Sequence, residues 1–240
     1  AGYAGNDGPV FMNLTIKNCS VTGSTITGKG SAGGIIGHGS GNAWTNVVIE
    51  ATTVSGNTIT STGSSTNKAG AVMGTIGAAG QPTTVNGVTH TGGMSVSATV
   101  AENDVKSNGT VITTIYGRQG TATGMLAVAG GSYDNYPIEE GVAYAAPAAG
   151  YKIEANEDGT YGVVVDPAYG KVAKVGDEYF ATLQEAINAA QNDETVVLLN
   201  TITLADADMV KTEDNRNVML NISNKSIPLD LNENTINIDY

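Results

Sequence analysis

Two acidic side chains, Glu102 and Asp104, lie close together in the first half of the chain. Glycoside hydrolases use two carboxyl groups roughly 5–9.5 Å apart, one as general acid and the other as nucleophile or base. If the segment around them is a strand, alternation places both carboxylates on one side of it. Their neighbours offer no further group suited to catalysis, so the sequence favours a solvated strand face over a hydrolase site.

A lyase that acts on uronate sugars needs basic side chains and an acidic cluster that binds calcium, because the substrate carboxylate is neutralised before a proton is removed. The chain has only two arginines, Arg118 and Arg216. One acidic cluster lies in a predicted loop between strands: Asp206, Asp208, Glu213 and Asp214. Oxygen ligands of this kind suit a hard cation such as calcium, and the alternative is a set of solvated loop acids; the cluster lacks the spacing of an EF-hand. We therefore predict no catalytic residue, no metal site and no cofactor.

Four residues are candidates for ligand binding. Trp44, the only tryptophan, lies at a predicted turn, where an exposed indole can stack on a sugar or anchor a protein contact; the alternative is packing over an edge of the fold. Arg118 also lies on a predicted turn, either contacting a ligand or simply solvated. Tyr133 and Tyr136, together with Tyr144, form a second candidate patch, for which the alternative is packing within a cap.

Charge is distributed unevenly. Residues 1–131 carry four acidic and five basic side chains, whereas residues 132–240 carry 19 acidic and 6 basic side chains. A protein that binds nucleic acids or anionic glycans needs a concentrated stripe of basic side chains. The sequence has none and argues against both as partners. No run of 18 apolar residues is present, so we predict no membrane insertion. The single cysteine, Cys19, is predicted to be a small buried residue on a strand.

A repeat of 33 residues organises the first half. Residues 13–27 return as residues 46–60, the glycine-rich run 33–37 returns as 70–74, and a degenerate third copy covers residues 100–117. Short alternating strands at a fixed period, separated by glycine turns, indicate a solenoid. The same alternation occurs in up-and-down sandwiches, but the recurring glycine pairs favour an all-β chain built on a parallel β-helix over residues 1–131.

The second half divides into two zones. Residues 132–167 are rich in tyrosine and contain Asp158-Gly159 between alternating strands, which predicts a hairpin that caps the repeats. Residues 168–240 are predicted to be a second β-helix-like unit. It opens with a helix at 182–191, where Thr182 and Glu185 form a capping box. Five short strands are predicted after the helix, within residues 195–238.

Several segments resemble a known class of domain. The segment 172–190 followed by 195–199, and the later segment 229–236, resemble the entry and closing segments of right-handed parallel β-helix domains in large secreted or wall-anchored proteins of gut bacteria. The glycine-rich runs resemble repeats of bacterial surface adhesins. The resemblance implies a right-handed parallel β-helix, an extracellular or cell-surface location, and binding or display, and it carries no catalytic residue across.

From the resemblance we expect a bacterial surface adhesin or binding module that is not an enzyme. The expected partner is a host glycan or host glycoprotein, such as a mucin or a secreted immunoglobulin. Two alternatives stay open, a polysaccharide-acting lyase or glycosidase and a structural spacer that binds nothing. The repeat pattern is already under way at Ala1, so we also expect the chain to be a fragment of a longer protein.

Overall fold

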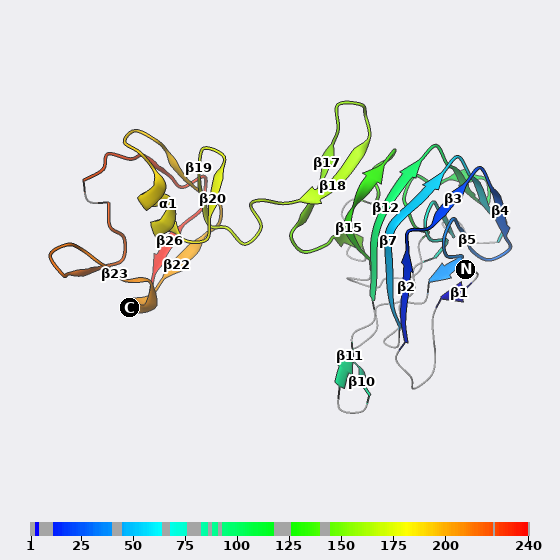
Figure 1. Ribbon diagram of the computed structural model, residues 1–240, viewed down its shortest axis with the longest axis horizontal. Helices are drawn as coiled ribbons and strands as arrows, with labels where there is room; N and C mark the ends of the chain where they lie inside the picture. Colours follow the sequence, from blue (N-terminus) through cyan, green and yellow to red (C-terminus); the bar gives the residue numbers. More distant parts are fainter. Residues whose placement is uncertain are drawn as a thin grey trace. The chain divides into compact units, whose positions relative to one another are not determined.

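The computed structural model describes residues 3–4, 12–39, 45–63, 68–75, 83–85, 88–90, 93–117, 126–139, 145–222 and 224–239. The chain divides into two compact units, unit 1 (Ala1–Val165) and unit 2 (Asp166–Tyr240). Both are built mainly from strands, and the one α-helix of the described residues lies in unit 2 (Figure 1).

The strands of unit 1 are short, apart from β7, β12 and β15. In chain order they are β1 (Tyr3–Ala4), β2 (Met12–Lys17), β3 (Ser20–Thr22), β4 (Thr25–Gly28), β5 (Ala32–Gly33), β6 (His38–Gly39), β7 (Thr45–Ser55), β8 (Thr58–Ser61), β9 (Ala69–Gly70), β10 (Thr83–Val85), β11 (Val88–His90), β12 (Gly93–Ala101), β13 (Asp104–Ser107), β14 (Thr110–Val111), β15 (Leu126–Tyr133), β16 (Ala145–Pro147), β17 (Tyr151–Ala155) and β18 (Tyr161–Val165).

The 33-residue period of the sequence is the register of parallel strand pairing. In the eight-stranded sheet, β2, β7, β12 and β15 lie side by side (Figure 1). Leu14 pairs with Val47 and Ile16 with Ile49, each 33 residues further on. The β-branched and aliphatic residues alternate with polar ones, so one face of each strand is apolar and packs inward. The predicted relation between the first two copies is therefore confirmed.

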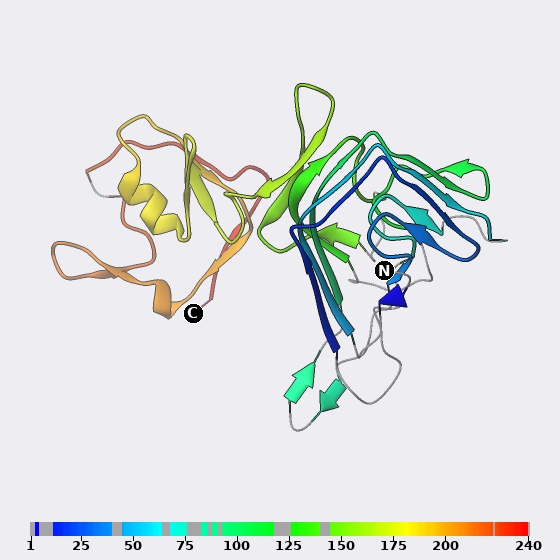
Figure 2. The ribbon, with the colours of Figure 1, turned by 45° about the vertical axis from the view of Figure 1, so that its right-hand side comes forward.

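A second sheet continues the same register after a bend in the chain. Strands β4, β8 and β13 pair in parallel, with Ile26 opposite Ile59 and Val105 opposite Ile59 on the other side. Strand β14 closes this sheet as an antiparallel edge. Figure 2 shows the successive copies following one another around the same bends. The degenerate third copy predicted from the sequence is thus in register with the first two.

Glycines allow the copies to approach closely in a third region. Gly33 on β5 pairs in parallel with Gly70 on β9. A Cβ atom added to Gly70 would overlap the backbone of Tyr116 and the carbonyl oxygen of Met73. This contact explains why the glycine pairs recur at the same phase of the sequence.

The core of unit 1 lies between these sheets. Its fully buried large side chains come from all the copies: Ile36, Ile49, Ile59, Met73, Ile115, Tyr116, Leu126 and Tyr133. The first copy is less buried than the others, since Leu14 and Ile26 are only half-buried.

The predicted hairpin is confirmed. Strands β17 and β18 pair antiparallel, with Ala155 opposite Tyr161. Asp158 accepts hydrogen bonds from the backbone N–H of Thr160 at 2.9 Å and from its hydroxyl at 2.6 Å. These bonds hold the pKa of the Asp158 carboxyl below its ordinary value. Strand β18 also pairs antiparallel with β15, so the hairpin belongs to the same sheet as the repeats.

Unit 2 has a small core of its own, formed around the helix. Its elements are β19 (Ala173–Val175), β20 (Glu178–Phe180), α1 (Leu183–Ala189), β21 (Val196–Leu198), β22 (Ile202–Leu204), a 3₁₀ turn (Asp206–Asp208), β23 (Val210–Lys211), β24 (Asn217–Val218), β25 (Leu229–Asp230) and β26 (Ile236–Ile238). Leu183, Ala186 and Ile187 of α1 are buried.

The predicted capping box of α1 is confirmed. The hydroxyl of Thr182 accepts the N–H of Glu185 at 3.1 Å, and the Glu185 carboxylate accepts the N–H of Thr182 at 3.0 Å. Both bonds satisfy amides at the start of the helix that have no intrahelical partner.

The predicted right-handed parallel β-helix is wrong, because no sheet of the described residues closes into a solenoid. The strands that the structure describes form eight separate sheets. In the glycine-rich region, pairing shrinks to two residues on β5 and β9 and to single bridges such as Ile36 with Met73. Unit 2 departs further, because β19 pairs antiparallel with both β20 and β21.

The prediction for Cys19 is also wrong, because its side chain is exposed. Asn18 has a φ of 53°, a left-handed conformation that interrupts the alternation of β2. Cys19 therefore lies in the turn before β3, and its thiol donates to the carbonyl of Lys17 at 3.3 Å.

Candidate binding surface

Two of the four predicted ligand-binding residues, Trp44 and Arg118, lie outside the described residues, as does Tyr144. Tyr133 is at the end of β15, and its side chain is only 1% exposed. Its phenol donates to the carbonyl of Gly130 at 2.7 Å and accepts the N–H of Ala98 at 3.4 Å. Burial raises the pKa of this phenol well above its ordinary value. In this arrangement the ring is a core side chain and presents no surface to a ligand.

Tyr136 is half-buried. Its ring packs edge-on against Tyr161 of β18, with the ring centres 5.4 Å apart and the planes at 88°. Such T-shaped pairs are favourable beyond the area they bury. The contact attaches the hairpin to the segment that follows β15. Tyr136 thus packs against the hairpin, as in the alternative to ligand binding that the sequence left open.

The carboxylates Glu102 and Asp104 do not share a strand face. Glu102 precedes β13 and has a φ of 57°, so the alternation assumed from the sequence does not apply to it. Asp104 is paired with Lys106, Oδ2 to Nζ 2.7 Å. Both side chains are exposed, whereas a catalytic acid is usually held in a buried site. The pair therefore lacks the features of a hydrolase site.

Two members of the acidic cluster of unit 2, Asp208 and Asp214, accept local hydrogen bonds. Asp208 accepts the N–H of Ala205 at 2.9 Å. Asp214 accepts the hydroxyl of Thr212 at 2.7 Å and pairs with the guanidinium of Arg216. These contacts, the Thr212 hydroxyl first, hold the pKa of Asp214 below its ordinary value. Within the described ranges, no group of three or more His, Cys, Asp or Glu side chains is placed to hold a metal ion.

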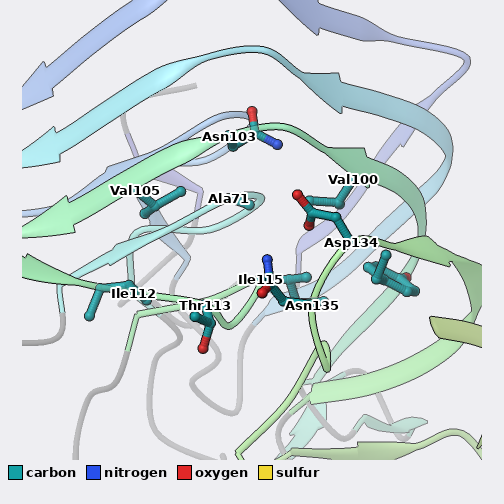
Figure 3. A pocket seen from close by; sticks show the side chains of 10 residues that line it. Ala71, Val100, Asn103, Val105, Ile112, Thr113, Ile115, Asp134 and Asn135 are labelled. Carbon is teal, nitrogen blue, oxygen red and sulfur yellow. The ribbon is translucent and has the colours of Figure 1, made fainter. Parts of the chain in front are cut away.

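A small cavity lies at the last repeat of unit 1. Figure 3 shows the side chains that line it, which come from Ala71, residues 100–105, residues 112–115 and residues 133–135. Its volume of about 10 Å³ is roughly that of one water molecule. Asn103 and Asp134 supply polar groups, and the N–H of Glu102 donates to Asp134 at 2.7 Å. The cavity is too small to hold a sugar or a side chain of a partner.

A regular exposed feature of the described part of unit 1 is a row of hydroxyl side chains that crosses four neighbouring parallel strands. Register places them directly opposite one another: Ser20 of β3, Thr53 of β7, Thr99 of β12 and Ser132 of β15. We call these four residues the hydroxyl row. Three of them are exposed and Thr53 is half-buried.

The chain positions the hydroxyl row through the residues that follow each member. Val54, Val100 and Tyr133 are 0–3% exposed, so alternation along each strand turns the preceding hydroxyl outward. Neighbouring strands are about 4.8 Å apart, so the row is about 14 Å long. Each hydroxyl is both a donor and an acceptor, which suits hydrogen bonding to sugar hydroxyls or to an extended backbone.

Small side chains also face outward elsewhere on the same sheet. Ser95, Ala127 and Ala129 lie between the inward-facing Met94, Val96, Leu126 and Val128. The register shifts between Val96 and Ala98, so these residues and the hydroxyl row lie on opposite sides of an irregularity in the sheet. A partner would contact such a surface through hydrogen bonds and shape, without enclosure in a pocket.

Sequence reasoning missed this row, although part of its signal is visible. Ser20 and Thr53 are 33 residues apart, and Thr99 precedes the residue that corresponds to Val54. Ser132 carries no such signal, because the prediction placed it in the cap and not on a strand beside β12.

Comparison of the chain with protein-family models, with characterised proteins and with solved structures finds no match. In the part of the chain that the structure describes, no helix is long and apolar enough to cross a membrane.

Proposed function

We propose that the chain is a binding module of a bacterial surface protein, located outside the cell, that recognises a host glycoprotein or glycan and catalyses no reaction. The observation that carries the proposal is the hydroxyl row, a line of donors and acceptors across four strands. The resemblance of several segments to surface proteins of gut bacteria supports the location and the kind of partner.

The chemistry of the described residues favours binding over catalysis. Asp104 and Asp214 are paired with neighbouring basic side chains, and Glu102 is exposed. A hydrolase or lyase needs one carboxyl group that acts as an acid and another that acts as a base or nucleophile. Burial or a metal ion usually creates this difference between them. A surface rich in small hydroxyl side chains needs neither to form hydrogen bonds with a partner.

The test is direct binding to two purified host materials, intestinal mucin and secretory immunoglobulin. The double variant Thr99→Arg with Ser132→Arg places two long charged side chains across the row. We expect wild-type protein to bind at least one of the two materials, and the double variant to bind it about tenfold more weakly or worse, since bulky residues prevent close contact at an interface core. Thr110→Arg, at an exposed position of β14, is the matched control.

Two results would contradict the proposal. If the wild-type protein binds neither material, the chain is better explained as a spacer. If incubation with uronate-containing polysaccharides releases unsaturated products, the chain is an enzyme.

A further inference from the structure

A groove of about 310 Å³ lies in unit 2, lined by residues of α1, of the 3₁₀ turn and of the strand pair β23 and β24. Figure 1 labels α1, β22 and β23, which all contribute to it. All of its lining residues lie between Thr182 and Leu220, inside the described range 145–222. Its volume is at the lower end of the range of small-molecule sites, roughly 300–1,000 Å³.

Apolar side chains form much of the lining. Leu183 of α1 and Leu204 of β22 are 2% and 8% exposed. Met209 directly precedes β23 and Met219 directly follows β24. Because these two strands pair antiparallel, the two methionines lie opposite each other at the groove. Methionine side chains adapt to the shape of a partner, and the thioether sulfur makes favourable contacts with aromatic rings.

Hydrogen bonds hold the segment after β24 against the helix. The side-chain amide of Gln184 on α1 donates to the carbonyl of Asn221 at 3.0 Å and accepts the N–H of Asn221 at 2.7 Å. The same amide donates to the side-chain oxygen of Asn188, one turn further along the helix, at 2.8 Å. These bonds keep Met219 and Leu220 next to α1, so the groove is held open by fixed contacts.

Two carboxylates also line the groove, Glu185 on α1 and Asp208 on the 3₁₀ turn. Each uses one oxygen for a local bond: Glu185 Oε2 accepts the N–H of Thr182 at 3.0 Å, and Asp208 Oδ2 accepts the N–H of Ala205 at 2.9 Å. Within the described residues, neither carboxylate is in an ion pair and no basic side chain lines the groove. The second oxygen of each can therefore accept from a ligand.

The charge of unit 2 favours a positively charged ligand. Residues 166–240 contain 13 acidic and 5 basic side chains. Of the basic side chains, Lys211, Arg216 and Lys225 each donate to other groups of unit 2. An acidic surface raises the local concentration of cations and repels anions. The methionines and the two carboxylates together select an aromatic ring with a positive charge near it.

We propose that the groove of unit 2 binds a small organic cation with an aromatic ring on a short chain, an arylalkylamine in its ammonium form. The ring packs against Met209 and Met219, and the ammonium group lies at the carboxylates of Glu185 and Asp208. Both carboxylates are exposed, so each ion pair contributes modestly, and burial of the ring supplies the rest. The site goes beyond the proposed function, because it belongs to unit 2 and uses no residue of the hydroxyl row.

The experiment is a titration of the full chain with phenethylammonium chloride, followed by nuclear magnetic resonance of isotope-labelled methionine methyl groups. We expect the signals of Met209 and Met219 to shift and saturate. The signal of Met73, which is 0% exposed in unit 1, should stay in place.

Two further compounds separate the contributions of charge and ring. Phenylpropionate carries the same ring on a chain of similar length but has a negative charge, and it should bind at least about tenfold more weakly. Methylammonium chloride lacks the ring and should leave the signals of Met209 and Met219 unchanged.

A double variant tests the carboxylates. Glu185→Gln with Asp208→Asn removes both charges, and glutamine can still complete the capping box, so unit 2 should stay folded. The variant should bind phenethylammonium about tenfold more weakly, since two solvated ion pairs supply roughly this factor. Asp177→Asn with Glu178→Gln removes two charges at exposed positions outside the groove. It is the matched control and should bind as the wild type does.

Three results overturn the inference. They are the lack of a saturable shift of Met209 and Met219 in the wild-type protein, equal binding of phenethylammonium and phenylpropionate, and unchanged binding by a double variant that keeps the wild-type circular dichroism spectrum. The first two need no substitution, so they decide the matter even with an unfolded variant. None of the three bears on the binding of mucin or immunoglobulin, which tests the hydroxyl row.

Discussion

The side-chain amide of Asn57 donates a 2.9 Å hydrogen bond to the side-chain oxygen of Asn103 on the next repeat. The two residues are equivalent by register, since each directly precedes a paired strand. Asn57 also donates to the carbonyl of Val21 and accepts the N–H of Ser24, both at 2.9 Å. One amide therefore joins three repeats, and it does so at a position that is 1% exposed.

Replacement of this amide should be costly. Asn57→Ala removes the side-chain amide that hydrogen-bonds the N–H of Ser24 and the side-chain oxygen of Asn103 in a buried site. We expect a loss of about 2 kcal/mol in the free energy of unfolding of unit 1. Urea denaturation followed by circular dichroism measures it. Asn46→Ala, at a less buried position whose side chain makes one long bond of 3.4 Å to Asn13, should cost under about 0.5 kcal/mol. Equal costs for the two variants would show that the amide does not link the repeats as described.

Glu102 occupies a backbone position that glycine occupies in the two preceding repeats. Its φ is 57°, and the equivalent Gly23 and Gly56 have φ values of 57° and 63°. A non-glycine residue is strained there. Glu102→Gly should stabilise unit 1 by roughly 0.5 kcal/mol, because relief of strain outweighs the greater freedom of glycine in the unfolded chain. Gly56→Ala should have the opposite effect. A lower unfolding midpoint for Glu102→Gly would contradict this account.

Gly70 lies at a close approach of two repeats. A methyl group there would overlap backbone atoms of Tyr116 and Met73, which cannot rotate away. We therefore expect Gly70→Ala to lower the stability of unit 1 by several kcal/mol, on the order of 3. Thermal unfolding provides the measurement. Gly30→Ala is the control, since a Cβ at Gly30 meets no atom, and it should change the midpoint little.

The buried phenol of Tyr133 should make unit 1 sensitive to alkali. Burial raises the pKa of this phenol in the folded protein, above the value of about 10 in the unfolded chain. Folding therefore favours the neutral form of the side chain. The resulting stability is complete below pH 10 and is lost as the pH rises above it. Tyr133→Phe should reduce this loss, at a cost of about 1 kcal/mol at neutral pH from the hydrogen bond to Gly130.

Urea midpoints measured from neutral pH to above pH 10 test this expectation. Tyr169→Phe, a change at an exposed tyrosine, is the control and should leave the pH dependence as in the wild type. Parallel curves for wild type and Tyr133→Phe would exclude the phenol as the source of the alkaline sensitivity.

Local patterns were enough to predict several elements. The 33-residue repeat predicted the parallel pairing of Leu14 with Val47, because side chains in a strand alternate and only one register buries the whole apolar face. The capping box of Thr182 and Glu185 and the hairpin at Asp158-Gly159 were also predictable, since both depend on hydrogen bonds within a few residues.

The sequence by itself therefore determined the strand pattern, the period and the positions of the tight turns. Only the tertiary structure decided that the sheets do not close into a solenoid and that Tyr133 lies in the core. It also decided that Ser132 lies in one row with Ser20, Thr53 and Thr99. The physical reason is distance along the chain. A turn or cap is fixed by neighbours in sequence, whereas closure, burial and the alignment of four hydroxyls depend on contacts between strands that lie more than 30 residues apart.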